Sequence, residues 1–117
     1  MDNERLVVRK PAEQVAVLAL LDEHDVANVG ELRAAALALV EEGRSLIVDF
    51  EQTAFIDSSV IHAIMDLRRE AEACGHEFAL HLGAASRVKR TLEITGATDM
   101  LACFEDLETA IECLGSR

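Results

Sequence analysis

The sequence predicts an α/β fold with one mixed, mostly parallel sheet, an N-terminal antiparallel hairpin and about four helices. Two observations carry this prediction. After the first two apolar runs, short apolar segments alternate with segments of helical period, which is typical of parallel strands joined by helical crossovers. The first two runs are separated by only about four residues, a spacing that favours an antiparallel hairpin. With 117 residues, the chain is expected to form a single domain over 1–117.

The hairpin is predicted from two apolar runs near the N-terminus. The first, Leu6 to Val8, is short and ends near Pro11, and we interpret it as an edge strand. The second, Val15 to Leu21, is continuously apolar and contains β-branched residues. A run of this kind indicates a strand that is buried on both faces of its sheet.

The middle of the chain predicts two helices around a central strand. The first helix is expected over Glu31–Glu42, where apolar residues recur at helical spacing and Gly43 can provide a C-terminal cap. Ser45–Phe50 follows as a central strand, and then a loop of about seven residues. The second helix is expected from about Ser59 to Cys74, before Gly75. Its predicted apolar stripe consists of Val60, Ile64, Leu67, Ala71 and Cys74.

The last third of the chain supplies two more strands and two more helices. Phe78 to Leu82 alternates as a strand does, and a third helix, which Ser86 can cap, ends at Gly96. A short strand around Leu101 to Phe104 then leads to Asp106, which can cap the last helix. The predicted elements fill the chain and leave no room for a second domain.

The composition excludes several classes of partner. The formal net charge is −11, so phosphate backbones and anionic membrane surfaces repel the chain, and we expect no contact with nucleic acid. No segment is apolar enough for membrane insertion, and no signal peptide is present, so a cytoplasmic location is expected. A monomer and a weak dimer both remain open. Cys74, Cys103 and Cys113 lack zinc-type spacing and are expected to be buried free thiols in a reducing compartment.

The turn Phe55-Ile56-Asp57-Ser58-Ser59 is the sharpest candidate for a site. It opens the second helix, at the end of an α/β sheet where sites form. Two serines at a helix start can simply cap free backbone N–H groups. A phosphoserine there would instead meet the positive end of the helix dipole, and its charge would repel a docked partner without disturbing the fold. From the turn alone, both interpretations stay open.

We expect neither catalysis nor metal binding. Ser58 and His62 are four residues apart and could face each other on a helix, but the sequence has no Gly-x-Ser-x-Gly elbow for a hydrolase. His76 and His81 are five residues apart near one strand, which places them on opposite faces. No cofactor is therefore expected.

Three stretches of the chain, taken together, resemble the STAS domains and the bacterial anti-sigma factor antagonists. The central stretch combines Leu46–Phe50 with Ala54–Ser59. Asp25–Leu32 is similar to the pattern that opens the family's first helix, and Val88–Gly96 is similar to its third helix with the glycine that ends it. The resemblance covers nearly the whole chain, and the family's order of elements agrees with the order predicted above.

The resemblance implies a phosphorylation switch. In that family, a partner anti-sigma factor, which is a serine kinase, phosphorylates the first serine of the turn. The unphosphorylated antagonist binds the kinase and frees the sigma factor, and a phosphatase restores this form. Ser58 would be the phosphoacceptor, and the domain itself would catalyse nothing. The residues expected to contact the partner are Asp25, Asn28, Asp57, Ser58, Ser59, Val60 and His62.

Two positions that follow the paired serines depart from the family's pattern. The family usually has glycine directly after Ser-Ser and often again two residues later, where this chain has Val60 and His62. Glycine lets another backbone approach closely, so these side chains could weaken docking of the usual kinase or suit a different partner. An alternative function therefore stays open: a non-phosphorylated STAS scaffold, or a subunit of a signalling or lipid-transport complex.

Overall fold

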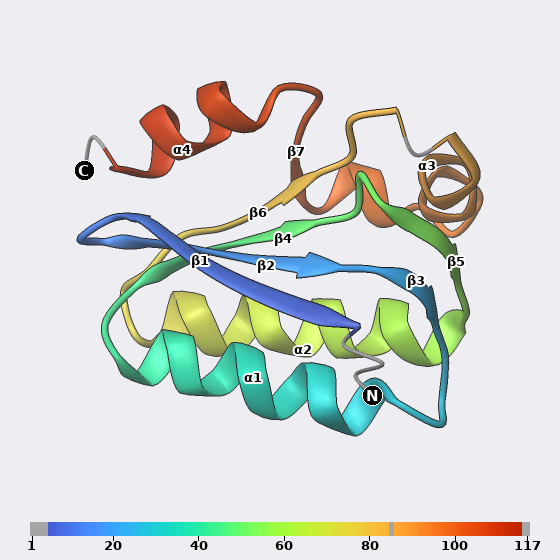
Figure 1. The fold of residues 1–117 in the computed structure, drawn as a ribbon, viewed down its shortest axis with the longest axis horizontal. Coiled ribbons are helices and arrows are strands. Elements are labelled where there is room, and N and C mark those ends of the chain that lie inside the picture. The colour runs from blue at the N-terminus through green and yellow to red at the C-terminus, as the bar shows by residue number, and fades with distance from the viewer. Residues whose placement is uncertain (1–4, 85, 116–117) are drawn as a thin grey trace.

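A five-stranded mixed sheet forms the centre of the fold (Figure 1). The computed structural model describes residues 5–84 and 86–115, except for the side chain of Ser86. Neighbouring strands follow the order β1-β2-β4-β6-β7; β1 and β2 are antiparallel and the other pairs are parallel, which confirms the predicted fold class. The strands are β1 (Leu6–Ala12), β2 (Val15–Leu20), β4 (Ser45–Asp49), β6 (Phe78–His81) and β7 (Ala102–Phe104).

Helices cover both faces of this sheet (Figure 1). Two of them, α1 (Val29–Glu41) and α2 (Ser58–Ala73), lie side by side on one face, and α4 (Leu107–Gly115) lies on the other. The remaining helix, α3 (Ser86–Ile94), packs against β5, a strand described below. None of the described helices has both the length and the apolar composition to cross a membrane.

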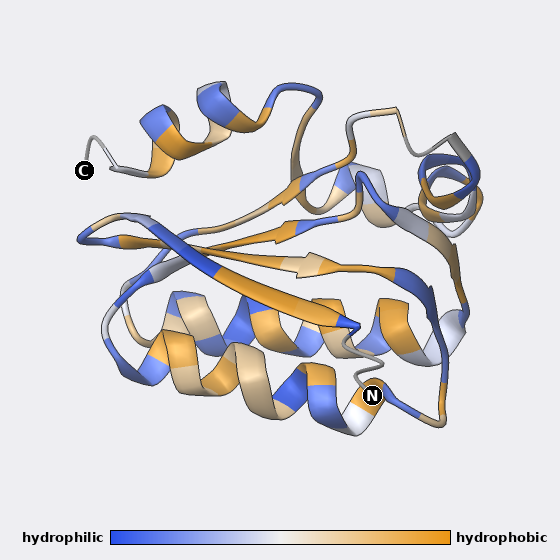
Figure 2. Ribbon diagram, in the orientation of Figure 1, coloured by the Kyte–Doolittle hydropathy of each residue, from blue (hydrophilic) through white to orange (hydrophobic). Residues whose placement is uncertain are grey.

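The core lies on both sides of the central strands, which are hydrophobic over most of their length (Figure 2). In β2, Ala16 and Leu18 belong to the larger cluster, which includes the buried residues of α1 and α2. Val15 and Val17 belong instead to the cluster under α4. Because successive side chains of a strand point to opposite faces, this division confirms that β2 is buried on both faces.

A second, two-stranded parallel sheet stands where the sequence predicted only loops. β3 (Asp22–His24) pairs with β5 (Thr53–Ile56), and β5 occupies much of the loop expected after Phe50. Periodicity missed both strands because they are short and because β3 is polar, with only His24 buried. The pair holds the loop that precedes α1 beside the segment that leads into α2.

Some element boundaries differ from the predicted ones. β1 continues through Pro11 to Ala12 with an irregular register, since an edge strand tolerates a residue that has no N–H donor. A short 3-10 helix, η1 (Ala97–Asp99), follows Gly96, whose φ of 79° places it in the left-handed region. The most consequential difference is that α2 begins at Ser58 rather than Ser59.

Cys74 and Cys103 are free thiols, but the prediction that the three cysteines are buried is wrong. All three are exposed. Cys74 follows the last residue of α2 and so lies beyond the apolar stripe to which the sequence assigned it. Cys103 lies in β7, at the edge of the sheet, and partial burial nevertheless raises the pKa of its thiol.

Candidate functional site

Asp57 is the N-cap of α2 and organises the turn that the sequence singled out. Its Oδ1 accepts hydrogen bonds from the backbone N–H groups of Ser59 (3.0 Å) and Val60 (3.3 Å) and from the Ser59 hydroxyl (2.5 Å). Its Oδ2 accepts a hydrogen bond from the N–H of Val26 (3.2 Å), in the loop between β3 and α1. One carboxylate therefore fixes the start of α2 and ties it to the neighbouring loop.

Ser58 is the first residue of α2, and its side chain is exposed. Within residues 5–84 and 86–115, its hydroxyl forms no hydrogen bond, because Asp57 already caps the helix. Ser59 differs, since it is partly buried and its hydroxyl donates to Asp57. The interpretation of Ser58 as a cap is therefore wrong, and the two adjacent serines are chemically distinct.

The loop before α1 is held by its own polar side chains. Asp25 Oδ1 accepts the N–H of Ala27 at 2.9 Å, and Asn28 Oδ1 accepts the N–H of Asp25 at 2.8 Å. The Asn28 amide also donates to the main-chain oxygen of Glu23 at 3.3 Å. With the bond from Val26 to Asp57, these contacts bring five of the predicted site residues together: Asp25, Asn28, Asp57, Ser58 and Ser59.

Val60 and His62, the two departures from the family pattern, have opposite environments. His62 is exposed and lines a hollow together with Ser58. Val60 is fully buried in the main hydrophobic cluster, in agreement with its place in the predicted apolar stripe of α2. A partner would therefore meet His62 directly, whereas Val60 could influence docking only through the packing of α2.

Four exposed apolar residues lie on the segments that lead into or border this turn. Val26, Phe55, Ile94 and Met100 are 73, 47, 75 and 54% exposed. Met100 lines the hollow of about 230 Å³ that contains Ser58. Phe55 and Ile94 line another hollow, of about 310 Å³. Clustered exposed apolar side chains mark interaction surfaces, and we call these four residues, with Ser58 and His62, the Ser58 face.

Sequence reasoning missed three members of the Ser58 face: Val26, Ile94 and Met100. Ile94 offered a usable signal, because it lies outside the inward stripe that Val88 and Leu92 form on the third helix. An apolar residue off such a stripe is expected to face solvent. Val26 and Met100 lie outside regular elements, where periodicity carries no information about burial.

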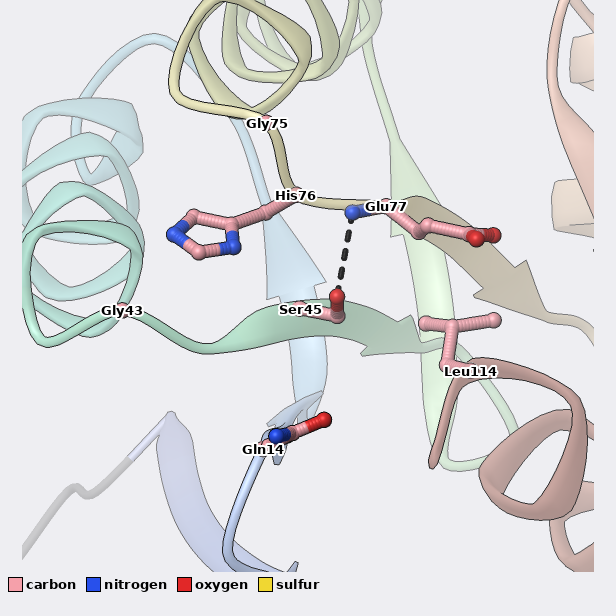
Figure 3. Close-up of a pocket in the computed structure, with 7 residues that line it drawn as sticks. All are labelled: Gln14, Gly43, Ser45, Gly75, His76, Glu77 and Leu114. Carbon is pink, nitrogen blue, oxygen red and sulfur yellow. Dashed lines mark hydrogen bonds between the residues drawn. The ribbon is translucent and has the colours of Figure 1, made fainter. Parts of the chain in front are cut away.

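A hollow of about 380 Å³ lies at the opposite end of α2, next to Gly75 (Figure 3). Most of its lining residues precede or begin β4 and β6, and the Ser45 hydroxyl there accepts the N–H of Glu77 at 3.0 Å. Sites in open α/β sheets form at the carboxyl ends of strands, and this hollow lies at the amino ends. The Ser58 face is therefore the better candidate site.

Because Asp57 caps α2, we expect Asp57→Ala to have a measurably lower unfolding free energy than the native protein. The hydrogen bond from the Ser59 hydroxyl, together with backbone N–H donors, lowers the pKa of Asp57 despite partial desolvation. The contribution of Asp57 to the unfolding free energy is therefore fully present above the unfolded-state pKa of about 3.9. It is lost as the pH falls through the lower folded-state pKa. At about pH 7 we expect Asp57→Ala to lower the unfolding free energy by about 1 kcal/mol.

Urea denaturation of the native protein and the variant measures this difference. It should shrink as the pH is lowered below about 3.9, because this carboxylate then binds a proton more readily in the unfolded state than in the folded state. Ser59→Ala, which removes one of the bonds to Asp57 and leaves the carboxylate, should cost less. Equal stability of Asp57→Ala and the native protein at neutral pH would contradict the capping role.

Comparisons with known proteins agree with this architecture. The sequence model of the family described as STAS domain matches residues 7–110. The anti-sigma factor antagonist SpoIIAA of Bacillus, in its unphosphorylated form, is similar with a TM-score of 0.75 at 20% identity, over 96% of this chain and 99% of that one. Its phosphorylated form gives a TM-score of 0.70 at 20% identity, over 92% and 98%.

An anti-sigma factor antagonist from Mycobacterium paratuberculosis is also similar, with a TM-score of 0.80 at 18% identity, over 93% of this chain and 92% of that one. No curated protein matches the sequence. The solved structures establish a shared fold, and the family match extends from β1 into α4. The chain belongs to the STAS domain family.

Proposed function

We propose that this domain is an anti-sigma factor antagonist that binds an anti-sigma factor serine kinase and is switched by phosphorylation of Ser58. The observation that carries the proposal is the division of roles at the turn. Asp57 caps α2, so the exposed Ser58 hydroxyl is not needed to hold the helix. A kinase could modify this hydroxyl without breaking a hydrogen bond among the described residues.

A phosphate on Ser58 is compatible with the fold. It would lie at the N-terminus of a helix of 16 residues, where the positive end of the helix dipole favours negative charge. The first turn of α2 contains no acidic residue, and the adjacent Asp57 is the one like charge at the cap. The modification would therefore act on the partner that covers the surface rather than on the stability of the domain.

The Ser58 face has the character of a surface that a partner covers. Its exposed apolar side chains would be removed from water in a complex, which is the main favourable contribution to association. In this proposal the ATP belongs to the kinase, a phosphatase restores the serine, and the domain acts in the cytoplasm as a binding protein. Release of the sigma factor would then regulate transcription without any contact between this acidic chain and nucleic acid.

One observation favours a second candidate, a STAS scaffold that is not phosphorylated. His62 stands on the Ser58 face, where the family usually has glycine, and its ring would obstruct the close approach of another backbone. The same apolar face would then serve a permanent complex in signalling or lipid transport. The two candidates differ in whether Ser58 accepts phosphate.

Phosphorylation of Ser58 is the test that separates them. Incubation with the cognate kinase and ATP should add one phosphate, which intact-mass measurement detects and peptide mapping locates on Ser58. Ser58→Ala should abolish the addition. Ser59→Ala is the matched control and should retain it, because the Ser59 hydroxyl is bonded to Asp57 in the unmodified protein. An unmodified protein after incubation with its cognate kinase would favour the scaffold.

A further inference from the structure

A histidine and two acidic residues meet at the carboxyl ends of two central strands. His81 ends β6, Asp49 ends β4, and Glu51 follows two residues later. The side chain of His81 is only 3% exposed. Its Nδ1 lies 2.7 Å from Asp49 Oδ1, and its Nε2 lies 3.7 Å from Glu51 Oε1. None of the three residues belongs to the Ser58 face.

Asp49 fixes the orientation of the imidazole. Its Oδ1 accepts both the Nδ1–H of His81 and the N–H of Glu51 (3.0 Å), while its Oδ2 lies 3.6 Å from the guanidinium of Arg9. With both oxygens engaged, Asp49 holds the proton of His81 on Nδ1. Carboxylates orient metal-binding imidazoles in this way, through the ring nitrogen that does not bind the metal.

The other nitrogen of His81 then faces oxygen atoms. Its Nε2 lies 3.3 Å from the main-chain oxygen of Glu105, in addition to the carboxylate of Glu51. A neutral imidazole that carries its proton on Nδ1 has only a lone pair at Nε2, and a lone pair cannot bond to an oxygen acceptor. The two oxygen atoms could share a cation with this lone pair, or the ring could carry a second proton and donate it to Glu105.

Gly83 makes room for the Glu51 carboxylate at this position. A Cβ atom on Gly83 would lie 3.0 Å from the carboxyl carbon of Glu51 and 3.1 Å from Oε1, closer than side chains normally pack. The φ of Gly83 is 55°, in the left-handed region that favours glycine. A side chain at position 83 would therefore displace the Glu51 carboxylate from its place beside His81.

We propose that His81 Nε2, the Glu51 carboxylate and the Glu105 main-chain oxygen bind Zn²⁺ or a similar first-row divalent cation. Imidazole and carboxylate are ligands that this class of ion accepts, with bonds of about 2.0–2.2 Å. Two ligands at that distance from one ion lie up to about 4 Å apart, so the separations of 3.3 and 3.7 Å from Nε2 suit a shared ion. Water would complete the coordination.

The site differs from the sequence expectation for a simple reason. Spacing along the chain reveals a metal site only where its ligands lie close together in sequence, and the partners of His81 are distant in sequence. Its partners come instead from β4 and from the segment after β7, which only the parallel pairing of the strands brings together. A bound ion would join the segments that follow β4 and β7 to the end of β6.

Calorimetric titration of the 117-residue chain with Zn²⁺ tests the site. Cys74, Cys103 and Cys113 are first replaced with serine, because exposed thiols bind Zn²⁺ themselves. We expect one ion per chain and a melting temperature that rises with Zn²⁺ concentration. Glu51→Gln should weaken binding at least about tenfold. Glu70→Gln, which removes the same charge from an exposed position on α2, should leave it unchanged.

Nitrogen NMR of the imidazole rings distinguishes an ion bound at His81 from a second proton on its ring. It does not require a substitution of this buried residue. Zn²⁺ should shift the Nε2 resonance of His81 while Nδ1 keeps its proton. Absence of saturable binding, equal binding by Glu51→Gln, or a ring that stays protonated on both nitrogens in excess Zn²⁺ would overturn the proposal. His81 would then be a structural imidazolium that donates to Glu105. Each of these outcomes leaves the proposed role of Ser58 untouched.

Discussion

Ser58→Asp is expected to weaken binding of the partner kinase by about 30-fold or more. Ser58 lies among exposed apolar side chains, so a partner that covers this face would remove the new carboxylate from water. An unpaired charge at the centre of an interface costs about 2 kcal/mol or more, which corresponds to this factor. Calorimetric titration of the kinase with the native domain and with the variant measures the change.

The same substitution should leave the unfolding free energy within about 1 kcal/mol of the native value, because an acidic residue at a helix N-terminus is favourable or neutral. Ser58→Asn is the matched control, since it has nearly the shape of aspartate without the charge. It should bind the kinase within a few-fold of the native domain. Equal loss of binding in both variants would show that shape rather than charge matters at this position, and undiminished binding by Ser58→Asp would contradict the switch.

The main sheet could be predicted from the sequence because most of its strands are runs of apolar residues. Val15–Leu20 is apolar throughout, and residues of both faces are buried, so its position in the interior is evident from composition. The small sheet could not be predicted in the same way. Asp22–His24 is a polar segment whose strand conformation depends on its pairing with Thr53–Ile56, a long-range contact that local patterns do not encode.

At the site, the sequence identified the turn but not the role of each side chain. Asp57, Ser58 and Ser59 can all cap a helix, and residue type alone does not decide which of them does. The structure assigns the cap to Asp57 and leaves Ser58 exposed. His24 and His81 illustrate the same limit, because both are polar by type and yet buried at strand ends, where burial lowers the pKa of His24.

Val60→Gly is expected to lower the unfolding free energy by about 2–4 kcal/mol, although it restores the residue that the family usually has. Val60 is fully buried, so the substitution loses the burial of a branched side chain, worth about 1.5–3 kcal/mol. Glycine within a helix adds a cost of up to about 1 kcal/mol. Urea denaturation at about pH 7 measures the total.

His62→Gly is the matched control on the same helix. His62 is exposed, so its replacement should cost only the helical penalty of glycine, less than about 1 kcal/mol. A loss for Val60→Gly no larger than that for His62→Gly would contradict the burial of Val60. Comparison of the two variants also shows whether Val60 or His62 accounts for any effect of the departure from the family pattern on kinase binding. A change in kinase binding by Val60→Gly could follow from a loosened α2, whereas a gain of binding by the stable His62→Gly would identify the exposed imidazole as the group that obstructs the usual partner.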